Sequence, residues 1–131
     1  MLDGSPSDSP DAEDRFARLL KWPARHPVIT AMALTLLVEG ITCLFRFGCG
    51  LQSTRDTAWL ARFTFGLRIH HGYIGALLAL PAMALQRKFG LWVRLVLAGG
   101  VALALSDAIH HFLVLWPVTG ASEFDLIYGA G

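Results

Sequence analysis

The chain has 131 residues, of which 54% are hydrophobic and 16% are charged, and its formal net charge is +1. It is too apolar for an ordinary soluble domain and too short for more than one domain. A net charge close to zero, without a run of Lys or Arg, gives no support for nucleic-acid binding. The composition instead predicts an all-α integral membrane protein that contacts the lipid bilayer.

The N-terminal segment is predicted to lie at the membrane surface. Residues 1–10 are mostly Ser, Asp, Pro and Gly, which is typical of a polar tail. Residues 11–26 open with acidic side chains and carry apolar ones at helical spacing from Phe16 to Trp22. This pattern predicts a short amphipathic interfacial helix, which Pro23 and the Arg25-His26-Pro27 stretch would break. Because no cationic stretch leads into an apolar core, we expect no cleavable signal peptide here.

Three apolar stretches follow. We predict a three-helix transmembrane domain over residues 27–117, with spans at about 28–48, 64–85 and 91–116. A helix needs about 20 residues to cross roughly 30 Å of hydrocarbon. The connection between the second and third spans is short, so these two helices are predicted to be antiparallel neighbours. Residues 118–131 form an acidic, turn-rich tail.

The distribution of Lys and Arg predicts the orientation. Seven of these residues lie in the N-terminal segment and around the second connection: Arg15, Arg18, Lys21, Arg25, Arg87, Lys88 and Arg94. Four lie on the other side: Arg46, Arg55, Arg62 and Arg68. Because cytoplasmic loops carry the excess of positive charge, the N-terminus is predicted to be cytoplasmic and the C-terminal tail extracytoplasmic, in a bacterial inner membrane.

Ionisable side chains inside the predicted spans mark a candidate site, since such groups are costly in a bilayer unless they are paired, liganded or face a cavity. The six residues are Glu39, His70, His71, Asp107, His110 and His111. With a rise of 1.5 Å per residue, both histidine pairs lie about 9 Å below the outer boundary and the glutamate about 14 Å below it. Steps of about 100° place Asp107, His110 and His111 on one helix face. We therefore expect the three helices to bring these groups into one layer of the outer leaflet.

Imidazoles combined with carboxylates favour a transition metal over Ca²⁺ or Mg²⁺, which prefer oxygen ligands. We predict that the protein binds one or two ions of Fe, Cu or Zn, and redox activity is compatible with such a site. The predicted ligands are the four histidines, with Glu39 and Asp107 as ligands or as partners that orient them. Three helices form a thin bundle, so a homo-oligomer or a larger membrane complex is expected. The sequence identifies neither a substrate nor a reaction.

Each residue also has a purely structural interpretation. Asp107 could hydrogen-bond a histidine and fix the third span to its neighbours. Glu39 could form an ion pair with Arg46 or Arg68. Cys43 lies four residues after Glu39, on the same face, and could be a further ligand, but packing in the core is the simpler interpretation. Cys43 and Cys49 are interpreted as buried apolar thiols, because residues six apart on a helix point in nearly opposite directions and do not form a disulfide.

The stretch from Asp107 to His111 resembles the H-x-x-H-H box of membrane-bound di-iron desaturases and hydroxylases, with Asp at the first position. The chain has four intramembrane histidines and three predicted spans, fewer of each than that family. The family's activity is therefore not carried over to this chain.

Two alternatives to a metal-ion site remain open. His70 and His110, on facing helices at equal depth, could ligate a b-type haem or a pigment in an electron-transfer subunit, with Gly75 and Gly100 making room for the macrocycle. The polar layer could instead dock a non-catalytic accessory subunit onto a larger membrane complex. In that case the polar groups would hydrogen-bond to the partner and need no cofactor.

Overall fold

The structure, a computed structural model, describes residues 10–128, and its regular elements are helices. The predicted all-α class is confirmed for this part of the chain. In chain order the elements are α1 (Pro10–Arg25), α2 (Pro27–Cys43) continued by the π-helix η1 (Leu44–Gly48), α3 (Ser53–Asp56), the 3₁₀-helix η2 (Ala58–Arg62), α4 (His71–Leu85), and α5 (Gly90–Ala108) continued by the π-helix η3 (Ile109–Leu115) and by α6 (Trp116–Thr119). The polar tail predicted for residues 1–10 lies outside the described residues except for its last position.

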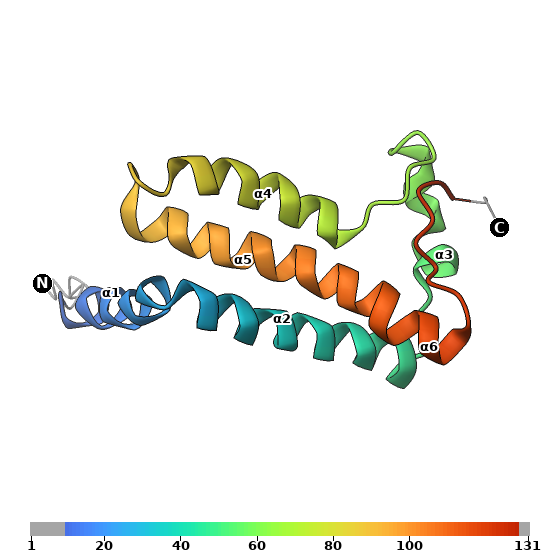
Figure 1. The fold of residues 1–131 in the computed structure, drawn as a ribbon, viewed down its shortest axis with the longest axis horizontal. Coiled ribbons are helices and arrows are strands. Elements are labelled where there is room, and N and C mark those ends of the chain that lie inside the picture. The colour runs from blue at the N-terminus through green and yellow to red at the C-terminus, as the bar shows by residue number, and fades with distance from the viewer. Residues whose placement is uncertain (1–9, 129–131) are drawn as a thin grey trace, which may run out of the picture.

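The three long helices form a flat layer with α5 in the middle (Figure 1). Helix α4 packs on one side of α5 and α2 packs on the other, and within the described residues α2 and α4 do not contact each other. Helix α1 contacts α2 and α5 at the end where the connection between α4 and α5 lies. Because α5 has a neighbour on each side, two opposite faces of this one helix are available for polar contacts.

Glycines allow α4 and α5 to touch through their backbones. A Cβ atom on Gly75 would lie 2.5 Å from the carbonyl oxygen of Gly100, and one on Gly100 would lie 2.8 Å from the nitrogen of Ala79. Small residues at such crossings are a common packing device between membrane helices. At the start of α4, a Cβ on Gly72 would lie 2.6 Å from Oδ2 of Asp107. The close crossing therefore brings the N-terminus of α4 against the carboxylate on α5.

The second predicted span, which begins at about residue 64, is not helical over residues 64–70. Helix α4 begins at His71, and His70 before it has an extended backbone with φ −89° and ψ 142°. Residues 64–70 do not continue the helix because Gly66 has φ +81° and the backbone around it pairs with the C-terminal tail. The nitrogen of Arg68 donates to the Leu126 carbonyl at 2.9 Å, and the nitrogen of Tyr128 donates to the Gly66 carbonyl at 2.9 Å.

Two helical segments are long and apolar enough to cross a membrane by length and composition alone: Pro27–Gly48, with 22 residues, and Gly90–Thr119, with 30 residues. Helix α4 is a shorter apolar helix of 15 residues. The break predicted at Pro23 is wrong, because α1 continues through Pro23 to Arg25. The chain leaves the helix at His26, whose helical conformation is disfavoured by Pro27.

Candidate metal centre

Two polar clusters lie on opposite sides of the helix formed by α5 and η3. Asp107 and His111, four residues apart, face the start of α4. Ser106 and His110, also four residues apart, face α2. Adjacent helical residues diverge by about 100°, which explains the separation. The predicted common face for Asp107, His110 and His111 is therefore wrong for His110, which points to α2.

The first group, which we name the His–Asp cluster, consists of His70, His71, Asp107 and His111. The Nδ1 atom of His70 lies 3.1 Å from Nε2 of His111. Oδ1 of Asp107 lies 3.7 Å from the same His70 nitrogen and 3.8 Å from the same His111 nitrogen. It also lies 3.3 Å from Nδ1 of His71. Relative exposure is 5% for His70, 4% for Asp107 and 6% for His111, whereas the side chain of His71 is 31% exposed, so three of the four residues are buried and the fourth lies at the edge of the cluster.

Backbone carbonyls of the C-terminal tail fix the hydrogen positions on two of these rings. Nδ1 of His111 lies 2.6 Å from the Ser122 carbonyl, and Nε2 of His70 lies 3.2 Å from the Asp125 carbonyl. A carbonyl only accepts hydrogen bonds, so each of these ring nitrogens must carry the hydrogen. In the neutral rings, Nδ1 of His70 and Nε2 of His111 then present lone pairs to each other and to Asp107.

Three acceptors therefore converge without a donor between them. Oδ1 of Asp107 is buried and has no hydrogen-bond partner among the described residues, and the same holds for Nε2 of His71. Lone pairs in such proximity repel one another, and a proton or a metal ion between them relieves this repulsion. In a tetrahedral site with metal–ligand bonds of about 2.0–2.1 Å, the ligand atoms lie about 3.3 Å apart. The separations of 3.1, 3.7 and 3.8 Å lie close to that value.

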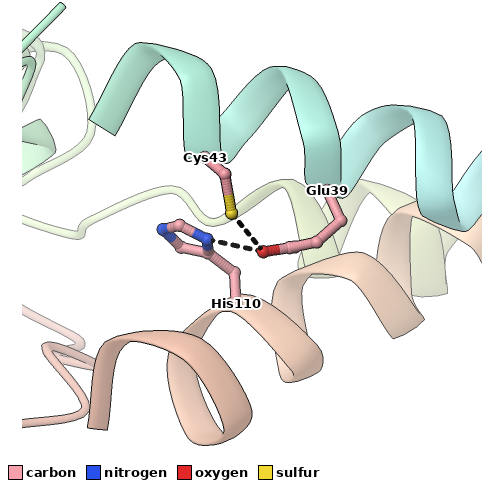
Figure 2. Close-up of side chains that lie close together, drawn as sticks. All are labelled: Glu39, Cys43 and His110. Atoms are coloured by element: carbon pink, nitrogen blue, oxygen red, sulfur yellow. Dashed lines mark hydrogen bonds and ion pairs between the residues drawn. The ribbon is translucent and has the colours of Figure 1, made fainter. Parts of the chain in front are cut away.

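The second group, which we name the Glu39 cluster, consists of Glu39, Cys43, Ser106 and His110. Figure 2 shows the carboxylate, the thiol and the imidazole of this cluster. Oε1 of Glu39 lies 3.0 Å from Nδ1 of His110 and 3.1 Å from Sγ of Cys43. Its other oxygen accepts a hydrogen bond of 3.2 Å from Ser106. Unlike Asp107, this carboxylate has three donors around it.

A cavity of about 260 Å³ opens beside both clusters. His70, His71, Asp107, His110 and His111 line it. Its remaining wall combines apolar side chains such as Phe45 and Leu115 with Arg46 and Arg68. A small molecule or water in this cavity therefore reaches the imidazoles directly.

The C-terminal tail closes the end of the helical layer over the His–Asp cluster. Arg46 pairs with Glu123 at 2.5 Å, and Arg68 lies 3.4 Å from the Asp125 carboxylate. The ring of Phe124 stacks on His70 with centroids 4.5 Å apart and contacts the ring of His111 at 5.2 Å. The sequence interpretation missed this role of the tail, although its acidic residues and the two arginines inside the apolar stretches signal charge complementarity.

Replacing Phe124 with Ala is expected to loosen the tail. Aromatic pairs contribute about 1 kcal/mol each, so losing the stacks on the two histidines costs roughly 2 kcal/mol of local stability. The amides of Arg68 and Tyr128, which are hydrogen-bonded between tail and loop, should then exchange about 30-fold faster with deuterium. Phe65→Ala removes a ring that is 98% exposed and should leave these rates unchanged.

Several simpler interpretations of single residues do not describe the structure. Glu39 contacts His110, Cys43 and Ser106, whereas the predicted partner Arg46 pairs with Glu123. Both cysteines are free, as expected, but Cys49 is exposed and not buried.

The space expected for a haem macrocycle between Gly75 and Gly100 is filled, because the two backbones are in direct contact. His70 and His110, the predicted axial ligands, belong to different clusters, with His70 beside His111 and His110 beside Glu39. The structure thus places His70, His71 and His111 in one small cluster and His110 in another.

Comparisons with known proteins do not assign the chain to a family. No family model matches the chain, and neither the curated proteins nor the solved structures include a match. Function is therefore inferred from the geometry of the two clusters.

Proposed function

We propose that this chain is an integral membrane protein that binds a divalent transition-metal ion at the His–Asp cluster. The ligands are Nδ1 of His70, Nε2 of His111 and Oδ1 of Asp107, with His71 next to the carboxylate as a further ligand or a hydrogen-bond donor. The observation that supports this proposal is the convergence of three acceptors, two of which belong to rings whose outer N–H groups are already hydrogen-bonded to carbonyls. Histidines that ligate metals commonly donate their other N–H to a carbonyl in this way.

The donor set favours Zn²⁺, Fe²⁺ or Cu²⁺. Two or three neutral imidazoles with one carboxylate form a mixed nitrogen and oxygen shell, which suits these ions better than Ca²⁺ or Mg²⁺. The cavity beside the cluster leaves room for a water or a small ligand on the ion. An ion with such an open position polarises whatever binds there, so hydrolytic or redox chemistry on a lipophilic molecule is compatible with the site.

The exposure of the helices supports a membrane location. Only 17% of the apolar window in Pro27–Gly48 and 28% of that in Gly90–Thr119 is buried, whereas the core helix of a soluble protein is mostly buried. Leu36, Leu77 and Leu113 are between 69% and 74% exposed. In water these side chains would expose large apolar surfaces on both faces of the flat layer, which is unfavourable in free energy. Contact with lipid chains avoids this unfavourable exposure.

Helix α4 would span with help from the non-helical residues before it. Its 15 residues cover about 22 Å at 1.5 Å per residue, less than the hydrocarbon thickness. Residues 64–70 complete the distance, and their backbone pairs with the tail, as irregular backbone at membrane depth requires. With the cytoplasmic N-terminus that the charge distribution favours, both clusters lie in the outer leaflet.

The polar groups need no larger partner to shield them. Ser106, Asp107, His110 and His111 are between 0% and 6% exposed within the single chain. This burial favours a site built by one chain over a polar layer that docks an accessory subunit. The flat layer still exposes two broad apolar faces, so self-association through these faces is part of the proposal.

Metal analysis tests the proposal directly. Untagged protein extracted from membranes in mild detergent is expected to retain metal, and His111→Ala is expected to lose about one ion per chain relative to the wild type. The matched control is His26→Ala, since His26 is exposed at the break between α1 and α2. A wild-type protein that holds no metal and takes up none on titration with Zn²⁺, Fe²⁺ or Cu²⁺ would show that a proton, not a metal, bridges the two histidines.

A further inference from the structure

The Glu39 cluster combines three ligand types from two helices. Glu39 and Cys43 come from α2, and His110 comes from η3. The carboxylate oxygen, the thiol sulfur and the ring nitrogen all lie within 4.8 Å of one another. We infer that this cluster is a second cation site, which takes a thiophilic divalent ion such as Zn²⁺, Co²⁺ or Cd²⁺ with Cys43 as its thiolate ligand.

The distances suit a small tetrahedral shell. With a metal–sulfur bond of about 2.3 Å and metal–oxygen and metal–nitrogen bonds of about 2.0 Å, the edges measure about 3.3–3.5 Å. Glu39 Oε1 lies 3.0 Å from the His110 nitrogen and 3.1 Å from the Cys43 sulfur, and the ligand atoms of Cys43 and His110 lie within 4.8 Å of each other, so entry of an ion needs side-chain shifts of up to about an ångström. The i, i+4 spacing of Glu39 and Cys43 holds both ligands on one face of α2.

The charge balance favours the ion over the protons. Glu39 is 12% exposed at its side chain and lies in the middle of an apolar helix, where an ionised carboxylate with only neutral donors is costly. A divalent cation with one carboxylate and one thiolate forms a cluster of zero net charge. Soft thiolate ligands also select Zn²⁺ and related ions over the hard cations.

Binding requires one proton to leave. The sulfur–hydrogen bond of Cys43 breaks, the thiolate forms a bond to the ion, and the proton passes to solvent. His110 keeps its single ring hydrogen, which moves from Nδ1 to Nε2 as Nδ1 takes the ion. Figure 2 shows this second nitrogen pointing away from Glu39, and His110 lines the cavity, so water can mediate the exchange. No electron transfer is involved.

The two sites are separate mononuclear sites. The ring centroids of His110 and His111 are 5.6 Å apart, and each ring belongs to its own cluster. Neither carboxylate bridges the two sites. Asp107 faces the rings of His70, His71 and His111, and Glu39 faces the ring of His110. Occupation of the Glu39 cluster consequently does not depend on occupation of the His–Asp cluster.

Cobalt titration of the full chain tests this inference. Metal-free, untagged protein in detergent is titrated with Co²⁺, and a thiolate-to-cobalt charge-transfer band in the near ultraviolet is expected to grow until one equivalent is bound at this site. Cys43→Ser should abolish the band, because a hydroxyl keeps the hydrogen bond to Glu39 but supplies no thiolate. Cys49→Ser is the matched control and should retain the band. Asp107→Asn, which disables the other cluster, should also retain it.

The wild-type protein supplies an independent test. Zn²⁺ is expected to slow alkylation of Cys43 by iodoacetamide at least tenfold, as measured by mass spectrometry, while the exposed Cys49 reacts at the same rate with and without Zn²⁺. The inference is overturned if no charge-transfer band forms, if the band survives in Cys43→Ser, or if Zn²⁺ leaves the alkylation of Cys43 unchanged. If the wild-type protein binds metal at the Glu39 cluster but not at the His–Asp cluster, the proposed function is overturned and the inference about the Glu39 cluster stands.

Discussion

Asp107→Asn is expected to weaken Zn²⁺ binding at the His–Asp cluster by about 100-fold, or about 2.7 kcal/mol. Asn has the shape of Asp but no negative charge, and its amide group adds two donors. One of these donors can reach the lone pair on His70 or His111, which face Asp107 at 3.7 and 3.8 Å. The metal-free variant should therefore be more stable than the metal-free wild type by about 1 kcal/mol, because a missing hydrogen bond is supplied.

The opposite signs of these two effects separate a metal site from a structural hydrogen-bond network. Isothermal titration with Zn²⁺ gives the affinity, and thermal unfolding with and without Zn²⁺ gives the stability. Asp56→Asn is the matched control, since the Asp56 carboxylate pairs with the neighbouring Arg55, outside the His–Asp cluster. A metal-free Asp107→Asn protein that is several kcal/mol less stable than the wild type would indicate that Asp107 is ion-paired with a protonated histidine.

The apolar segments and the convergence of the polar residues were predictable from the sequence for a simple reason. Antiparallel helices joined by a short connection place residues near the start of one helix beside residues near the end of the next. His70 and His111 meet for this reason, although 41 residues separate them. The lengths of the apolar stretches and of the connection between them predict that these ends meet, and this prediction does not depend on how individual side chains pack.

The division into two clusters was not predictable in the same way. It depends on which neighbour lies on which side of α5, and the sequence pattern of small and apolar residues does not determine this arrangement. A π-helix over Ile109–Leu115 also changes the angular spacing on which the helix-face argument relied. The position of Cys43 beside Glu39 and His110 was not predictable either, because His110 comes from a different helix.

The start of α4 and the role of the tail depend on backbone contacts, which leave little trace in a single sequence. The Ser122 and Asp125 carbonyls orient two histidines, and any residue type could supply a carbonyl. The prediction of a helix from residue 64 followed the apolar composition, but tertiary pairing with Leu126 and Tyr128 prevailed over this local preference.

Gly100→Leu is expected to separate α4 from α5 and to disable the His–Asp cluster from a distance. A Cβ at this position would lie 2.8 Å from backbone atoms of both Gly75 and Ala79, which cannot move as a flexible side chain can. Overpacking of this kind costs about 3 kcal/mol. Because His70 and His71 move with α4 while Asp107 and His111 stay on the other helix, Zn²⁺ affinity at this cluster should fall at least roughly tenfold.

Gly99→Leu is the matched control, because a Cβ on Gly99 has no neighbour within 4 Å. Thermal unfolding in detergent should show a lower midpoint for the Gly100 variant and no loss for the Gly99 variant. The Glu39 cluster lies between α2 and α5, so its cobalt charge-transfer band should persist in both variants. Equal stability of the two variants would contradict the close crossing of α4 and α5. Loss of the cobalt band along with Zn²⁺ binding would show that the two clusters form one site, since separating α4 alone leaves the α2 side in place.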